Sequence, residues 1–309
     1  MAFLPLEIAK AIRPVHWLKN LSVFAALVFS GNLFELSLLY RVFFLFLIFN
    51  VAASSTYVFN DLLDADKDKL HPIKKQRPVA KGTITKLQAL VIAGVLAILA
   101  LLLAYYFLSY LIFLLIFGYL LLQASYSLFL KHISIVDILI IATGFIVRVF
   151  AGALIIDAHL SVWFLLCIIS VALFLAAGKR RAEIGLIQTP GQTRKSLTNY
   201  SIELLNSYVT MFGNAAWMSW ALFTFFESPK AAMPVWLFLA ELSKATTINK
   251  LLMLTIPVTI FGIMRYQSLI FAGKSEAPEK TLLTDIPLVS SVVIWAGMVV
   301  WILYSGVSV

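Results

Sequence analysis

The chain has 309 residues, of which 61% are apolar and only 13% are charged, and it contains 24 Phe, 11 Tyr and 7 Trp. Its mean hydropathy is +0.96. These values exclude a water-soluble globular fold, because the few polar residues could not cover a surface that faces water. Apolar runs of about the length of a bilayer span recur, so we expect a bundle of transmembrane helices.

Nine stretches are apolar and long enough to cross a bilayer as helices. They are residues 20–38, 39–59, 87–108, 110–130, 134–156, 161–178, 201–226, 250–272 and 286–306. Gly31, Asn32 and Glu35 interrupt the first stretch, so a count of eight stays open. The N-terminus lacks the pattern of a removable signal peptide, and we expect the first stretch to be retained. The single cysteine, Cys167, lies in an apolar stretch and is interpreted as a packing residue.

The basic residues are distributed unevenly over the two sides of such a bundle. With nine helices, 19 of the 24 Lys and Arg residues fall on the side of the N-terminus, and Arg148 lies inside a span. The positive-inside rule therefore predicts a cell (inner) membrane protein whose N-terminus is cytoplasmic and whose C-terminus is outside. Topology and contacts with anionic lipids explain this charge as readily as a functional site does, and no nucleic-acid partner is needed.

The loop after the second span carries an acidic pattern. If the second helix continues past Asn60, then Asn60, Asp64 and Asp68 lie at positions i, i+4 and i+8, and Asp61 shares their face. Asp66 falls off this face and is expected to be exposed to solvent. Like charges that lie so close repel, so we predict a bound cation, and oxygen ligands without Cys or His favour Mg²⁺. The predicted metal ligands are Asn60, Asp61, Asp64 and Asp68.

Cations from Lys67 to Lys81 accompany the acidic residues and could hold phosphate oxygens beside the metal. Because a bound Mg²⁺ beside such cations is typical of a site for phosphate groups, we expect a phosphorylated substrate. The alternative is an ordinary solvated loop of mixed charge.

The pattern Asn60-Asp61-x-x-Asp64-x-x-x-Asp68, followed by Arg77-Pro78, resembles the first aspartate-rich motif of the UbiA superfamily of intramembrane prenyltransferases. The resemblance implies an all-α multi-pass membrane protein with nine helices around a central cavity that binds Mg²⁺ and a diphosphate. It implies a single domain over residues 1–309. Its cytoplasmic active-site loops would lie at about 60–86, 131–133 and 179–200.

The second aspartate-rich motif of that superfamily is absent. The matching segment is Gly178-Lys179-Arg180-Arg181-Ala182-Glu183, followed by Arg194-Lys195-Ser196 and Tyr200. Such cations would bind a phosphate and repel a second metal ion. Together with Arg13-Pro14-x-x-Trp17-x-Lys19-Asn20 and the segments around Tyr126, Lys131, Asp137 and Arg148, this segment resembles the branch of decaprenyl-phosphate phosphoribosyltransferases.

Membership of that branch implies an enzyme, a pentosyltransferase that moves the 5-phosphoribosyl group from phosphoribosyl diphosphate to a polyprenyl phosphate and releases diphosphate. Asp61, Asp64 and Asp68 would be the catalytic residues that hold Mg²⁺ on the leaving diphosphate. The predicted substrate-binding residues are Lys19, Asn60, Arg77, Tyr126, Lys131, Asp137, Lys179, Arg180, Glu183 and Lys195. The partners would be the two substrates and the lipid bilayer, and a homo-oligomer stays open.

Other interpretations stay open. A UbiA-type prenyltransferase acting on an aromatic acceptor would need the second acidic cluster, and a transporter would need polar groups along a path through the membrane. The Lys179-Arg180-Arg181 run could serve topology alone. Arg148 could be structural, satisfied by helix carbonyls. Glu183 could pair with Lys179 as i and i+4 neighbours on one helix.

Overall fold

The computed structural model describes residues 4–70, 74–185, 200–227, 246–273, 281 and 283–305. Every regular element within these residues is a helix, which confirms the predicted all-α class. The chain forms two compact units. The first unit contains residues 1–24, 40–157 and 187–200, and the second contains residues 25–39, 158–186 and 201–309. A single domain over residues 1–309 stays a prediction.

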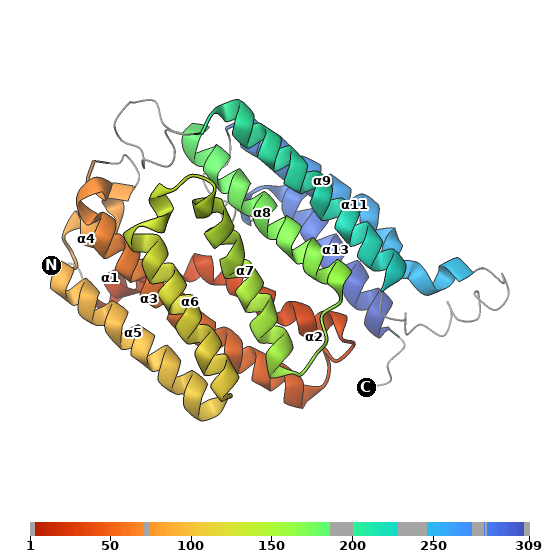
Figure 1. Cartoon of the computed structure of the whole chain (residues 1–309), viewed down its shortest axis with the longest axis horizontal. Helices are drawn as coiled ribbons and strands as arrows, with labels where there is room; N and C mark the ends of the chain where they lie inside the picture. The colour runs from red at the N-terminus through yellow and green to blue at the C-terminus, as the bar shows by residue number, and fades with distance from the viewer. Residues whose placement is uncertain are drawn as a thin grey trace. The chain divides into compact units, whose positions relative to one another are not determined.

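Four long helices dominate the first unit, coloured from red to yellow-green in Figure 1. They are α3 (Leu36–Asp68, all but its first residues), α5 (Lys86–Phe107), α6 (Tyr110–Leu128) and α7 (Val136–Ile155). The shorter elements are α1 (Leu4–Ala11), η1 (Pro14–Phe24), η2 (Lys74–Gln76), α4 (Pro78–Lys81) and η3 (Leu130–His132). Helix α5 begins with a reciprocal cap, because the Thr85 hydroxyl accepts from the Gln88 N–H while the Gln88 side chain accepts from the Thr85 N–H.

The second unit contains α2 (Ala25–Phe29), α8 (Val162–Gly185), α9 (Ile202–Phe226), η5 (Thr246–Thr255), α11 (Ile256–Phe271) and α13 (Ile286–Tyr304). Helices α8 and α9 pack side by side (Figure 1). Phe29 of α2 contacts the rings of Phe164, Trp220 and Phe223, so aromatic packing holds α2 against α8 and α9. Cys167 is buried in α8, as its interpretation as a packing residue requires.

Seven helices in the described part of the chain are long and apolar enough to cross a membrane, so the count of nine is not confirmed. The predicted span 20–38 is instead covered by η1, α2 and a turn in which Gly31 has a φ of +81°. The apolar helical stretch there, Pro14–Phe29, is too short. The predicted span 201–226 corresponds to α9, which is not among the seven because polar residues such as Asn214 lower its hydropathy.

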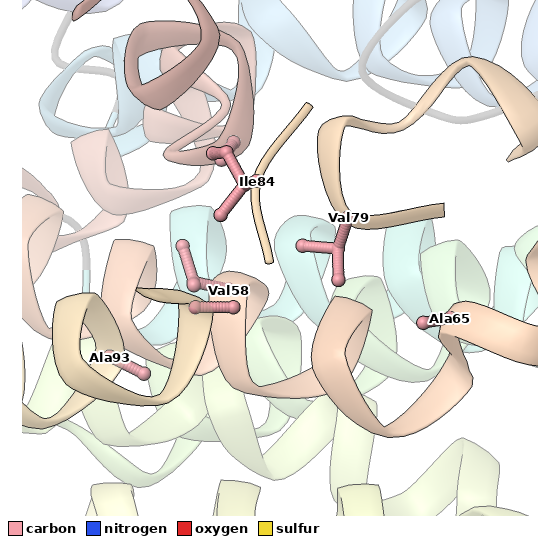
Figure 2. Close-up of a cluster of buried hydrophobic side chains, with 7 residues drawn as sticks. Val58, Ala65, Val79, Ile84 and Ala93 are labelled. Carbon is pink, nitrogen blue, oxygen red and sulfur yellow. The ribbon is translucent and has the colours of Figure 1, made fainter. Parts of the chain in front are cut away.

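A hydrophobic cluster joins the N-terminal segment, α3, α5 and the segment after η2. Its buried members are Ala11, Val58, Ala65, Val79, Ile84, Ala89 and Ala93. Figure 2 shows Val79 and Ile84 pointing toward the helix that carries Val58 and Ala65. A hydrogen bond also joins α1 to the segment after α4, because the Thr83 hydroxyl donates to Glu7 Oε2 at 2.7 Å. The cluster therefore fixes the segment Arg77–Ile84 and the helix α1 against the C-terminal half of α3.

Gly152 allows the close approach of η1 to α7. A Cβ at this position would lie 1.9 Å from the carbonyl oxygen of Val23, whereas a Cβ at Gly94 of α5 would meet nothing within 4 Å. The missing side chain of Gly152 thus permits this close contact between the two segments.

Gly152→Ala is expected to lower the free energy of unfolding by about 1–3 kcal/mol, because the backbone of η1 must move away from α7. Gly94→Ala is the matched control, since it adds the same methyl group to a helix with free space. Thermal unfolding in detergent measures the difference. Equal stability of the two variants would contradict the close packing of η1 on α7.

Candidate active site

The acidic face predicted at the end of α3 is present. The helix continues to Asp68, and Asp61, Asp64 and Asp68 are all buried, with Asp61 only 1% exposed. Asp66 is 69% exposed at its side chain and pairs with Lys69 and Lys86, as expected for a residue off the buried face. A run of helical residues thus brings three carboxylates to one side of a single helix.

Each buried carboxylate is paired with a cation from another part of the chain. Arg77 Nη1 lies 2.6 Å from Asp68 Oδ2 and 3.1 Å from Asp61 Oδ1. Arg13 also pairs with Asp61 Oδ1. Lys131, which is 2% exposed, lies 2.7 Å from Asp64 Oδ1 and 3.4 Å from Asn60 Oδ1. Because the protein supplies these cations itself, repulsion among the carboxylates does not by itself require a metal ion.

The donor atoms of this acid–base cluster (Asn60, Asp61, Asp64, Asp68, Arg13, Arg77 and Lys131) still fit a hard cation. Asp61 Oδ2 is buried and has no hydrogen-bond partner among the described residues. Over the same residues, no group of three or more His, Cys, Asp or Glu side chains forms a ready-made metal cage. Mg²⁺ is commonly bound by one or two carboxylates together with substrate phosphates, so a preformed cage is not needed.

Arg77 is held in place by its local sequence. It precedes the short helix α4, which has Pro78 in its first turn and ends at Gly82, where φ is +82°. Val79 lies in the hydrophobic cluster of Figure 2, so the backbone next to Arg77 is anchored against α3. Burial and the nearby Arg13 guanidinium lower the pKa of Arg77 from its ordinary value. An arginine so placed still carries its charge at neutral pH, and it can hold two acidic partners at once.

Arg13 belongs to this site although it is absent from the predicted site residues. It lies between α1 and η1 with a φ of +52°, an unusual conformation for a residue with a side chain, and its guanidinium also lies 5.7 Å from the centre of the Tyr57 ring. The sequence signal was the pair Arg13-Pro14. The partner, Asp61, is 48 positions away and could not be found from spacing. Lys19, the predicted residue of this segment, lies in η1 with its Nζ 3.4 Å from His16 Nδ1.

Asp137 is fully buried at the start of α7. Its Oδ1 accepts hydrogen bonds from the Tyr200 hydroxyl at 2.8 Å and from the Ile138 N–H at 2.9 Å. The Tyr200 hydroxyl in turn accepts from the Ile135 N–H. Contact between Asp137 and ribose hydroxyls stays a prediction. Tyr126 lies half-buried near the end of α6.

Ile135 has an unfavourable backbone conformation, with φ 71° and ψ −49°. This combination is close to the γ-turn with positive φ, which is rare and strained, and Ile is branched at Cβ. Such a conformation costs about 1–3 kcal/mol and persists only where the surrounding structure enforces it. The N–H of Ile135 donates to the Tyr200 hydroxyl, and its carbonyl accepts from the Leu139 N–H.

Arg148 is buried in α7 and makes the following contacts within the first unit. Its guanidinium donates to Asn20 Oδ1 and to the Tyr119 hydroxyl, at 2.5 and 2.8 Å, and to the carbonyl of Gly144. Asn20 also donates to Asn50 Oδ1 at 2.6 Å. The structural interpretation of Arg148 is supported, because its contacts tie η1, α3, α6 and α7 together through neutral acceptors.

The basic segment predicted at the end of α8 lies in the second unit. Arg180 is fully buried and pairs with Glu183, while Arg181 Nε lies 2.7 Å from Asn206 Oδ1. Lys179 lies on the same last turns of α8. Lys195 lies outside the described residues. The segment thus concentrates three successive cations at one helix end, which suits an anion.

In this all-helical membrane protein, buried carboxylates opposed by cations form a site that can hold a metal ion and phosphate oxygens together. Residues 20–183 match the UbiA prenyltransferase family. The chain is 34% identical to the decaprenyl-phosphate phosphoribosyltransferase of Mycolicibacterium smegmatis, over 94% of this chain and 90% of that protein. It is 32% identical to the protein of the same name from Corynebacterium glutamicum, over 96% of this chain and 86% of that protein. This protein therefore belongs to the UbiA prenyltransferase family, and it is a transferase.

Solved structures agree on the fold. The chain resembles a UbiA homolog from Archaeoglobus fulgidus bound to GPP and Mg²⁺, with a TM-score of 0.68 and 18% identity, over 98% of this chain and 100% of that one. It also resembles a digeranylgeranylglyceryl phosphate synthase, with a TM-score of 0.62 and 14% identity, over 98% and 99% of the two chains. At these identities the likeness concerns the fold alone.

Lys131→Met is expected to lower the free energy of unfolding by about 3–5 kcal/mol, because it leaves the Asp64 carboxylate buried without its cation. Adding Asp64→Asn should recover most of this loss. Lys69→Met is the control, because its partner Asp66 is exposed, and little change is expected. Thermal unfolding of wild type, Lys131→Met, Asp64→Asn, the double variant and Lys69→Met makes the comparison. Additive losses in the double variant would contradict a direct pair.

Proposed function

We propose that this protein transfers the 5-phosphoribosyl group of phosphoribosyl diphosphate to a polyprenyl phosphate, such as decaprenyl phosphate, and releases diphosphate. The observation that carries the proposal is the similarity, over nearly the whole chain, to two proteins named decaprenyl-phosphate phosphoribosyltransferase. The basic end of α8 supports it, because a prenyltransferase would be expected to carry a second acidic motif there.

In the proposed reaction, the bond between the anomeric carbon and the diphosphate oxygen breaks. An oxygen of the lipid phosphate forms the new bond to that carbon, and diphosphate leaves. The attacking phosphate is already ionised, so no general base is assigned. The protein's main contribution is to align the two phosphates and to stabilise the charge that develops on the leaving group.

The acid–base cluster supplies that stabilisation in this proposal. Asp61, Asp64 and Asp68, with Asn60, would hold Mg²⁺, which would neutralise charge on the leaving diphosphate when bound. The guanidinium groups of Arg13 and Arg77 have several donors each, so they can keep their contacts with Asp61 and also bind phosphate oxygens. Lys131 adds a third positive charge beside Asp64.

One of the two other phosphates, on the sugar or on the lipid, is assigned to the basic segment of α8. Lys179 and Arg180 would bind the sugar 5-phosphate or the lipid phosphate, with Lys195 as a further ligand. Glu183 would orient Arg180, with which it is paired. Lys19, Tyr126 and Asp137 are proposed to contact the substrates from the first unit.

The decisive assay offers purified protein radiolabelled phosphoribosyl diphosphate with a polyprenyl phosphate and Mg²⁺. A parallel assay offers a prenyl diphosphate with 4-hydroxybenzoate. We expect label in the lipid fraction from the first reaction and no product from the second. Chelation of Mg²⁺ should abolish turnover, and its return should restore it. Product from the second reaction alone would establish a prenyltransferase instead.

Asp64→Asn and Lys179→Ala, made separately, are each expected to lower turnover at least a hundredfold, on the order of the loss of one electrostatic contact to a transition state. Both should still insert into the membrane. Asp66→Asn is the control, because it removes a carboxylate of the same helix that faces solvent. Unchanged turnover in Asp64→Asn would remove the proposed metal site.

The N-terminus and the active-site loops are proposed to face the cytoplasm. Leu70→Cys and Val162→Cys test this, since both positions are more than 70% exposed and the native Cys167 is buried. A membrane-impermeant thiol reagent added to whole cells is expected to label Val162→Cys and to spare Leu70→Cys until the cells are opened. Labelling of Leu70→Cys but not of Val162→Cys in whole cells would show the opposite orientation.

A further inference from the structure

The turn between η3 and α7 is held by a residue that lies far away in the sequence. The phenol oxygen of Tyr200 accepts the N–H of Ile135, and the phenol proton is donated to Asp137 Oδ1 at 2.8 Å. Asp137 Oδ1 also caps the first turn of α7 by accepting the Ile138 N–H at 2.9 Å. One buried hydroxyl thus links the N–H of a strained residue to the carboxylate that begins the next helix.

The same short turn carries Lys131. Its backbone is continuous with η3, in which the Ile133 N–H donates to the Leu130 carbonyl at 3.1 Å. The Asp137 N–H then donates to the Ile133 carbonyl at 3.1 Å. These bonds join the short helix that carries Lys131, the partner of Asp64, to the segment that contains Ile135, four residues further along the chain.

We infer that Tyr200 is a positioning residue of the active site: its hydroxyl holds Ile135 in its strained conformation and thereby sets Lys131 against Asp64. This inference rests on the proposed function for its importance to turnover, because it assigns Lys131 to diphosphate binding. Without the hydroxyl, the turn would relax toward an ordinary Ile conformation, and the Nζ of Lys131 would move away from the carboxylate.

Two properties of the site favour positioning over direct contact with a substrate. Both hydrogen-bonding capacities of the phenol, one as donor and one as acceptor, are used within the protein. Strained backbone persists where neighbouring groups enforce it, and the Tyr200 hydroxyl is bonded to the N–H of the strained residue itself. The residue that would relieve the strain is glycine, which adopts a positive φ without a Cβ penalty.

The test uses Tyr200→Phe, Ile135→Gly and the double variant Tyr200→Phe/Ile135→Gly in the full-length protein. Tyr208→Phe is the matched control, since it removes a phenol hydroxyl from α9 outside the proposed site. Two quantities are measured: kcat and KM for transfer, and the affinity for inorganic diphosphate in the presence of Mg²⁺, by calorimetry in detergent.

Tyr200→Phe is expected to weaken both the diphosphate affinity and kcat/KM about tenfold or more, with the KM for the lipid phosphate unchanged. The double variant should recover most of the loss, because glycine keeps the turn without the hydroxyl. Tyr208→Phe should behave as wild type. If Tyr200→Phe fails to accumulate in the membrane, the double variant is expected to accumulate, for the same reason.

Wild-type behaviour of Tyr200→Phe would overturn the inference. A loss that Ile135→Gly does not rescue would also overturn it, because the hydroxyl would then act directly on a substrate. The proposed function can fail independently of this inference. If wild-type protein binds Mg²⁺ and diphosphate but transfers no phosphoribosyl group, the proposed function is wrong. The positioning role of Tyr200 is then decided by diphosphate affinity alone.

Discussion

The pairing of three buried carboxylates with three cations at the end of α3 is the constraint on which the first unit depends. Asp61, Asp64 and Asp68 are removed from water, and burial of an unpaired charge costs several kcal/mol. Each carboxylate therefore requires a cation from another segment. Arg13, Arg77 and Lys131 come from the N-terminus, the loop after α3 and the turn after α6, so this one requirement organises all three of these segments around a single helix end.

Apolar and backbone packing make these ion pairs possible. The cluster of Figure 2 fixes the segment next to Arg77, and the close approach of Val23 to Gly152 fixes η1, which follows Arg13. The neutral polar contacts of Arg148 reinforce the same arrangement inside the bundle. The strained Ile135 lies just after the short helix that carries the third cation, Lys131. Two residues with positive φ, Arg13 and Ile135, thus lie in the segments that supply cations to the cluster.

The acidic half of the site could be predicted from the sequence, and the family resemblance added Arg77 and Lys131, whereas Arg13 and the pairing of each cation with its carboxylate could not be predicted. Helical spacing correctly placed the three carboxylates on one face and Asp66 outside it, because residues three and four apart on one helix are neighbours. Their partners depend on tertiary contacts: Arg13 lies 48 residues from Asp61, and Lys131 lies 67 residues from Asp64. Hydropathy likewise found the long apolar helices, but it counted η1 and α2 as a span, although Gly31 marked an interruption there that left a count of eight open.

The balance of charge in this cluster bears on which ligand it can accept. A divalent cation alone would have to compete with the arginine or lysine already bound to each carboxylate. A diphosphate alone would approach the arginines and the lysine but would also meet three negative charges. A complex of Mg²⁺ with diphosphate would avoid both problems. Carboxylate oxygens such as Asp61 Oδ2 would bind the metal. The phosphate oxygens would accept hydrogen bonds from Arg13, Arg77 and Lys131. Under the proposed function, a cluster that is neutral before binding favours the complex over either of its components.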